Sequence, residues 1–182
     1  MEVPITPCKP AIFRQLAEME VQNTVDFLEL IRSRHEAIVG ALDADAFAED
    51  VIAHSDALLS IAEESAVLGL HRVVELTASS IKKMRRATMK SNPRYKFLMA
   101  DEELIAERTL PGYAAVRELR LVNNAIKHEG IVSDVLAKEY PKWILGAPLA
   151  DLDSLIKVVA PVVPQYLEAL ATALLSERGK LI

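Results

Sequence analysis

One predicted helix face gathers the residues of this chain that are best suited to act on a phosphate group. At about 100° per residue, a sector roughly 80° wide carries Arg117, Arg120, Asn124 and His128. The opposite side of the same helix is apolar and carries Ala115, Leu119, Val122 and Ile126. Because a guanidinium fork matches phosphate oxygens and an imidazole titrates near neutral pH, the polar face has the chemistry to bind a phosphodiester and move a proton.

The end of this helix favours a reactive histidine. Gly130 is a typical helix stop, so His128 falls in the last turn, where the helix dipole favours the imidazolium form. Cleavage of RNA without a metal needs a proton-transfer group and cations that hold the phosphorane charge. We therefore predict a catalytic set of His128, Arg120 and Asn124, with Asn124 orienting the ring or the substrate. A solvated face that happens to be cationic is the alternative interpretation.

The segment Asn123-Asn124-Ala-Ile-Lys-His128 resembles the signature of the HEPN superfamily. These helical-bundle proteins belong to prokaryotic toxin–antitoxin and defence systems, and they carry Arg-x4-6-His near the end of a core helix. Asn124 and His128 match the pattern, but Asn123 stands in the usual place of the arginine, and Arg120 lies further upstream. The resemblance implies a homodimer with paired motif helices and RNA as the ligand. With the arginine displaced, it implies weak or absent metal-independent ribonuclease activity.

A second basic cluster precedes this helix. Seven basic residues and no acidic ones lie between positions 82 and 96, whereas acidic residues gather from Asp43 to Glu64. One interpretation is that these charges complement the two ends of a helix dipole, and the other is a phosphate-binding patch. The residues predicted to bind phosphate or RNA are Arg117, Asn123 and Lys127 on the two-faced helix, with Lys82, Lys83, Arg85 and Arg86 of this basic cluster.

Composition limits the classes of protein that fit. The chain has 182 residues, 51% of them hydrophobic, and a net charge of -5, which argues against a general nucleic-acid coat. Its single cysteine excludes an intramolecular disulfide, and the chain lacks a secretory signal, a membrane-length apolar run, a phosphate loop and Glu-x-x-His pairs. We expect a cytoplasmic protein with no cofactor, no metal and no membrane association. His71 is predicted to be a structural histidine.

Helix-forming residues dominate and strand signals are scarce, so the fold is predicted to be all-α. A first helix is expected from Pro10 to Gly40. A second helical region, free of proline from Asp43 to Pro93, is expected to bend or break at His54-Ser55 or near Gly69, because one straight helix of about 70 Å exceeds the size of a compact domain.

The remaining elements are shorter. A small helix is expected over Asp101 to Arg108, and the two-faced helix is expected to start with Thr109 as cap and Pro111 in its first turn. A packed loop with short helical pieces follows from Gly130 to Asp151. The last helix, from Asp153 to Glu177, is expected to kink or restart at Pro161 and Pro164.

Together these features predict one domain over residues 1–182, an elongated up-and-down helical bundle of HEPN type. Its predicted function is RNA binding in a defence or stress system, through the Arg/Asn/His face. The alternative function is a non-catalytic interaction or scaffold bundle that binds a cognate partner protein through an apolar helix face.

Overall fold

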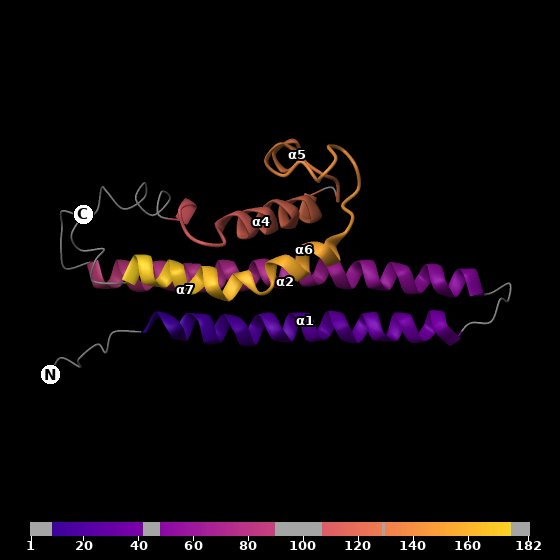
Figure 1. The fold of residues 1–182 in the computed structure, drawn as a ribbon, viewed down its shortest axis with the longest axis horizontal. Coiled ribbons are helices and arrows are strands. Elements are labelled where there is room, and N and C mark those ends of the chain that lie inside the picture. The colour runs from indigo at the N-terminus through magenta and orange to yellow at the C-terminus, as the bar shows by residue number, and fades with distance from the viewer. Residues whose placement is uncertain (1–8, 42–47, 90–106, 129, 176–182) are drawn as a thin grey trace.

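The computed structural model describes residues 9–41, 48–89, 107–128 and 130–175, and within them the chain forms helices and no strand (Figure 1). The helices are α1 (Pro10–Ala41), α2 (Ala48–Met89), α4 (Tyr113–His128), α5 (Asp134–Glu139), α6 (Leu152–Val159) and α7 (Val162–Leu175). The prediction of an all-α helical bundle is confirmed.

The two longest helices, α1 and α2, run antiparallel and side by side (Figure 1). Gly69 allows a close approach at the middle of this pair, because a Cβ built there would lie 3.2 Å from Cγ2 of Thr24. Nearer the C-terminal end of α1, Nδ1 of His35 and Oγ of Ser55 are 2.9 Å apart.

The predicted break in the second helix is wrong. α2 continues for 42 residues through His54-Ser55 and Gly69, a length of about 63 Å. The break was expected because a helix of this length is longer than a compact domain. However, α1 lies along α2, and the apolar face of α2 that is buried includes Ala62, Ala66 and Leu70. Packing along this face stabilises the long helix in an elongated molecule. The predicted start at Asp43 lies outside the described residues.

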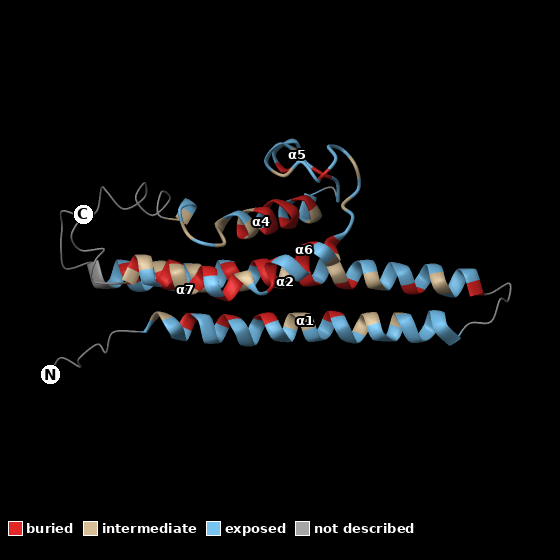
Figure 2. Ribbon diagram, in the orientation of Figure 1, coloured by how far each residue is buried: buried red, intermediate tan, exposed pale blue. Residues whose placement is uncertain are grey.

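The apolar core lies where α4, α6 and α7 pack on α1 and α2, at one half of the long pair (Figure 2). Leu70, Leu119, Leu155 and Leu167 are fully buried there. Burial of each such side chain contributes roughly 1.5–3 kcal/mol. The core therefore fixes α4 in place over α2, which matters for the site described below.

α4 begins later than the sequence predicts. Residues 109–112 form a turn, and the helix starts at Tyr113, so Thr109 is not its cap and Pro111 is not in its first turn. Gly112 has φ +82°, and a Cβ there would lie 2.6 Å from Cγ1 of Val162. The chain thus turns tightly against α7 before α4 can start. The helix predicted over Asp101 to Arg108 lies mostly outside the described residues.

The predictions for the C-terminal third are largely confirmed. Gly130 has φ +68°, and its N–H donates to the carbonyl of Ala125 at 2.9 Å, closing the helix as expected. The last helical region restarts at Pro161, where α6 and α7 meet with a 43° bend. No single helix in the described ranges is long and apolar enough to cross a membrane, although α6 and α7 together pass on length and composition.

Candidate functional site

A groove of about 970 Å³ lies between the second half of α2 and the first half of α4. We call it the α2/α4 groove. α2 supplies one wall from His71 to Arg86, and α4 supplies the other from Tyr113 to Arg120. Glu107 and Arg108 stand at the entry to the turn before α4, and Glu139 reaches in from α5. Five separate stretches of chain, including α7, thus form one open depression.

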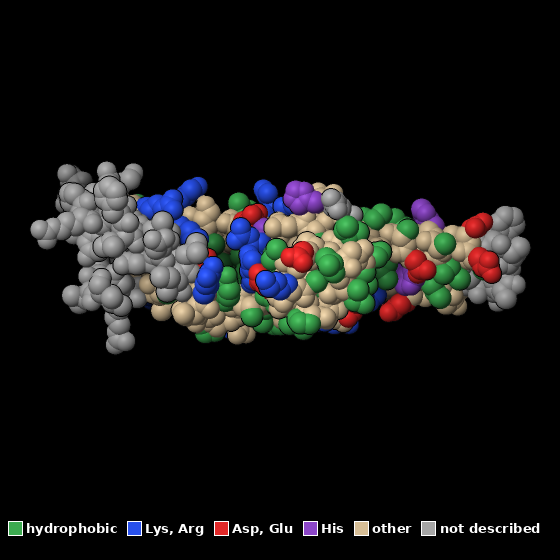
Figure 3. Space-filling model, turned by 90° about the horizontal axis from the view of Figure 1, so that it is seen from above, with side chains coloured by type: hydrophobic (Ala, Val, Ile, Leu, Met, Phe, Trp, Pro, Cys, Tyr) green, Lys and Arg blue, Asp and Glu red, His purple; other side chains and the backbone are tan. Residues whose placement is uncertain are grey.

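Cations dominate the lining of the groove. They are Lys82, Lys83, Arg86, Arg108, Arg117 and Arg120. Seen from above, blue Lys and Arg side chains gather over this half of the molecule, whereas red carboxylates gather toward the other end (Figure 3). The groove therefore concentrates positive charge on a chain whose net charge is -5.

Two carboxylates neutralise part of this charge. Glu139 accepts two hydrogen bonds from Arg117, at 3.1 Å from Nε and 2.9 Å from Nη2, and Glu107 forms an ion pair with Lys82. The hydrogen bonds and charge of Arg117 lower the pKa of Glu139 below its ordinary value. A third carboxylate, Glu75, lies near His71, so the described residues that line the groove include six cations and three carboxylates.

Arg120 and Lys83 differ from these paired cations. Across the described residues, neither forms an ion pair with a carboxylate, and both are exposed. Their charged groups face water, so a bound anion would not have to displace an internal partner from them. These two side chains, one from each wall, are the best placed to bind a phosphate.

His71 is the imidazole of the groove, and it is only 5% exposed. Its Nδ1 lies 3.5 Å from Oε2 of Glu75. Burial lowers the pKa of His71 below 6.5, and Lys127 and Arg120 lower it further, against the opposing effect of Glu75. The ring is therefore neutral at pH 7, in keeping with the predicted structural role.

Aromatic and apolar side chains complete the lining. Tyr113 is partly buried on α4, and Tyr166 is buried on α7, where loss of water raises the pKa of its hydroxyl above the ordinary value. Val74 and Val116 contribute apolar surface between the two walls. An aromatic face beside cations is the combination on which nucleic-acid bases stack while their phosphates are bound.

The segment after α4 is anchored so that Glu139 stays at the groove. Nε1 of Trp143 donates to the buried carboxylate of Glu118 at 2.7 Å, and Nζ of Lys142 lies 2.8 Å from the same oxygen. The hydroxyl of Tyr140 donates to the carbonyl of Ala114 at 2.6 Å, and burial raises the pKa of that hydroxyl to about 12. These contacts fix residues 139–143 against α4.

The structure divides the predicted site residues into three groups. Arg117, Arg120, Lys82, Lys83 and Arg86 line the groove. Asn124, Lys127 and His128 are exposed but do not line it, because the groove ends at Arg120. Asn123 and Arg85 are buried, at 1% and 7% exposure, so neither side chain is accessible to RNA in this structure.

Asn123 is buried because it lies on the side of α4 that packs into the bundle. Its Nδ2 donates to Oδ1 of Asn124 at 3.4 Å, whereas its own Oδ1 has no hydrogen-bond partner among the described atoms. Position 123 was predicted to contact RNA by analogy with the arginine of the motif. The inward position of its side chain corrects that prediction.

The sequence analysis did not predict Glu107, Arg108, Glu139 and Tyr166 at the site. Each lies on a different segment from the two basic clusters, and for Glu107, Glu139 and Tyr166 no neighbouring sequence pattern indicates a role in a binding site. Only Arg108 had a usable signal, as a cation just before the two-faced helix. No group of three metal-ligating side chains occurs in the ranges that the structure describes.

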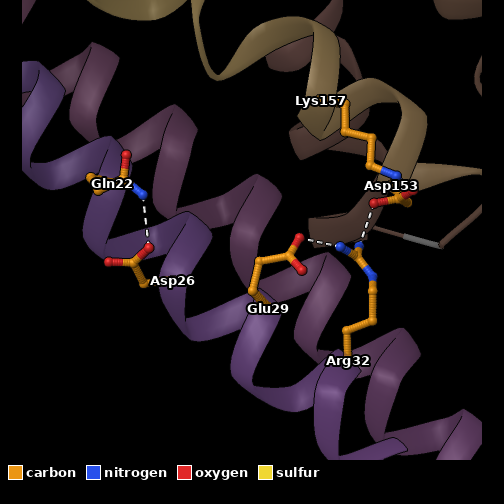
Figure 4. Close-up of polar contacts among 6 residues, drawn as sticks. All are labelled: Gln22, Asp26, Glu29, Arg32, Asp153 and Lys157. Carbon is orange, nitrogen blue, oxygen red and sulfur yellow. Dashed lines mark hydrogen bonds and ion pairs between the residues drawn. The ribbon is translucent and has the colours of Figure 1, made fainter. Parts of the chain in front are cut away.

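A second cleft, of about 460 Å³, lies between α1 and the α6–α7 bend. Its charged residues pair within the chain (Figure 4). Arg32, which does not line the cleft, forms ion pairs with two carboxylates that do, Glu29 and Asp153, and Nζ of Lys157 lies 2.7 Å from Asp153. Further along α1, Gln22 donates to Asp26 at 2.7 Å. These contacts tie α1 to α6.

Comparisons with known proteins give no relative for this chain. It matches no protein-family model, no curated protein and no solved structure.

Proposed function

We propose that this protein binds RNA through the α2/α4 groove, with weak or absent cleavage. One observation carries the proposal: Arg117 and Arg120 of α4 line the same groove as Lys82, Lys83 and Arg86 of α2. The two basic clusters are separated by some 30 positions in sequence, and the fold brings them together. A single-stranded phosphodiester chain fits such a groove, because its charges repeat along its length.

The aromatic lining adds to the argument for a nucleic acid. Tyr113 lies beside the cations, and a base that leaves the strand can stack on such a ring. Lys83 and Arg120 supply phosphate contacts from opposite walls, and Arg120 can bind two oxygens of one phosphate. Carboxylates between the cations keep the groove from binding every anion with equal strength.

Membership of the HEPN superfamily, and with it a role in a prokaryotic defence or stress system, is part of the same proposal. The helical bundle and the motif residues Asn124 and His128, at the end of a core helix, support it. Two features favour binding over cleavage: His128 lies outside the groove lining, and Glu139 holds Arg117. His71 is neutral and nearly inaccessible, so it is a poor substitute acid.

Salt-dependent binding tests the proposal. Fluorescence anisotropy with a labelled single-stranded RNA is measured from low to high KCl. Three phosphate contacts, from Lys83, Arg108 and Arg120, give a slope of log K against log salt of about -2. The double variant Lys83→Glu/Arg120→Glu should lower affinity about 100-fold and reduce the slope to about -0.7.

Lys157→Glu is the control, since it reverses one charge outside the groove, against two in the double variant, at a side chain of the second cleft that is 66% exposed. It should leave affinity and slope unchanged. Salt-independent binding, or equal losses in both variants, would refute the groove as the RNA site.

Cleavage is tested separately, with end-labelled total and transfer RNA in EDTA. We expect no products from the wild type or from His128→Ala. Cleavage by the wild type that disappears in His128→Ala would instead make His128 catalytic, and the proposal of a binding protein would fail in that part.

A further inference from the structure

The outward face of α1 carries an apolar stripe that no described element covers. It consists of Ile12, Leu16, Met19, Phe27, Leu30 and Ile38, which are between 38% and 54% exposed. The buried residues of α1, such as Phe13 and Leu28, lie on the adjoining face of the helix, toward α2 and α7. In Figure 2 the side of α1 away from α2 is pale blue along its whole length. α1 thus has two apolar faces, and the bundle uses one.

We propose that this stripe is a self-association surface, on which α1 of a second copy packs antiparallel with Phe27 at the two-fold axis. In an isologous contact, each residue faces the residue equally far on the other side of the axis. Leu16 and Ile38 are each eleven residues from Phe27, so they face one another. Eleven residues are three helical turns, which keeps them on one stripe of a straight helix.

Charge complementarity favours a second copy over an unrelated partner. Two charged residues flank or interrupt the stripe, Glu20 and Arg34, each seven residues from Phe27 and of opposite sign. Neither forms an ion pair in the part of the chain that the structure describes, although both are exposed. In the antiparallel arrangement Glu20 of one copy faces Arg34 of the other, and symmetry makes this pair twice.

The size of the surface sets the expected strength. From Ile12 to Ile38 the stripe is about 40 Å long, and with a helix about 12 Å wide it buries roughly 1,000 Å² over both copies. That area is at the lower end for specific interfaces, so the dimer should be weak and form at micromolar concentration. In Figure 1, α1 and α4 lie on opposite sides of α2, so a second copy that packs on α1 leaves the α2/α4 groove of each copy open.

Sedimentation velocity on the full chain tests the proposal, from about 1 to about 300 µM protein. We expect a concentration-dependent monomer–dimer equilibrium. Phe27→Glu places two like charges at the axis and should raise the dissociation constant at least about 30-fold. Ile144→Glu is the matched control, because Ile144 is 74% exposed on the far side of the bundle and should leave the equilibrium unchanged.

A charge exchange tests the register. Arg34→Glu brings like charges together and should weaken the dimer, and Glu20→Arg added to it should restore the dimer. Circular dichroism establishes that each variant keeps its helices. A monomer at every concentration, a dimer that persists in Phe27→Glu, or a double variant that stays weak would overturn the proposal.

Discussion

The α2/α4 groove is lined by six cations and three carboxylates, whereas the second cleft is lined by two cations and three carboxylates whose charges pair within the chain. At the second cleft, Arg32 pairs from outside the lining with Glu29 and Asp153, and the lining residue Arg14 pairs with Glu18 and with Glu168, which lies outside the lining. In the groove Arg120 and Lys83 point at water. The comparison teaches that the number of charged residues does not separate the two clefts, and that they differ in whether those charges are paired within the chain.

The first prediction concerns the pairs of the second cleft. Arg32→Ala removes a largely buried guanidinium and leaves Asp153 with only Lys157, so the free energy of unfolding should fall by about 2 kcal/mol. RNA affinity should not change. Urea denaturation followed by circular dichroism measures the first effect, and anisotropy measures the second. A loss of RNA affinity in this variant at unchanged folding would contradict the division between the two clefts.

The second prediction compares one arginine from each cleft. Arg120→Ala should lower RNA affinity about tenfold, because it removes a charge-assisted contact to phosphate. Arg14→Ala, whose guanidinium is already held by Glu18 and Glu168, should leave affinity unchanged. Both are measured by anisotropy at one salt concentration. If Arg14→Ala weakens binding as much as Arg120→Ala, pairing within the chain is not what separates the clefts.

The third prediction addresses Glu139, the carboxylate that would compete with RNA for Arg117 under the proposed function. Glu139→Gln releases the full charge of Arg117 and should raise RNA affinity by about threefold. Glu64→Gln, an exposed carboxylate on α2 outside the groove, serves as control. Weaker binding in Glu139→Gln would mean that Glu139 positions Arg117 for the ligand instead of competing with it.

The smallest effect is expected at His71. Because burial lowers its pKa in the folded protein, the unfolded chain binds a proton near pH 6.5 that the folded chain does not. Stability should therefore be lost as pH falls from about 6.5 toward the lower folded pKa. Urea denaturation of wild type and His71→Phe across this range measures the difference, which should disappear in the variant. A histidine resonance of His71 that titrates above pH 6.5 would refute the assignment.

Local sequence patterns were sufficient for much of the fold. Apolar periodicity and Gly40 predicted α1, Gly130 predicted the end of α4, and Pro161 predicted the restart between α6 and α7. These features depend on residues within a few positions of one another. The break predicted in α2 was wrong because its support comes from α1, and no pattern inside α2 reports that partner.

The candidate site was predictable only in part, for the same reason. Periodicity along α4 placed Arg117 and Arg120 on one face, and the charge run identified Lys82 and Lys83. The sequence could not show that these residues share a groove, because that depends on how α4 packs across α2. Nor could the sequence predict that Asn123 is buried, since the rotation of α4 about its own axis is fixed by the helices that pack against it.

The amino-acid sequence alone therefore determined the helical class of the fold, the C-terminal end of α4 and the face of α4 on which Arg117 and Arg120 lie, since these follow from backbone geometry and local side-chain spacing. The tertiary structure decided which faces meet, which cations are neutralised and which apolar face is left for another molecule. Those outcomes depend on packing between segments that are distant in the chain, because the same packing decides which side chains are buried and which charges form ion pairs.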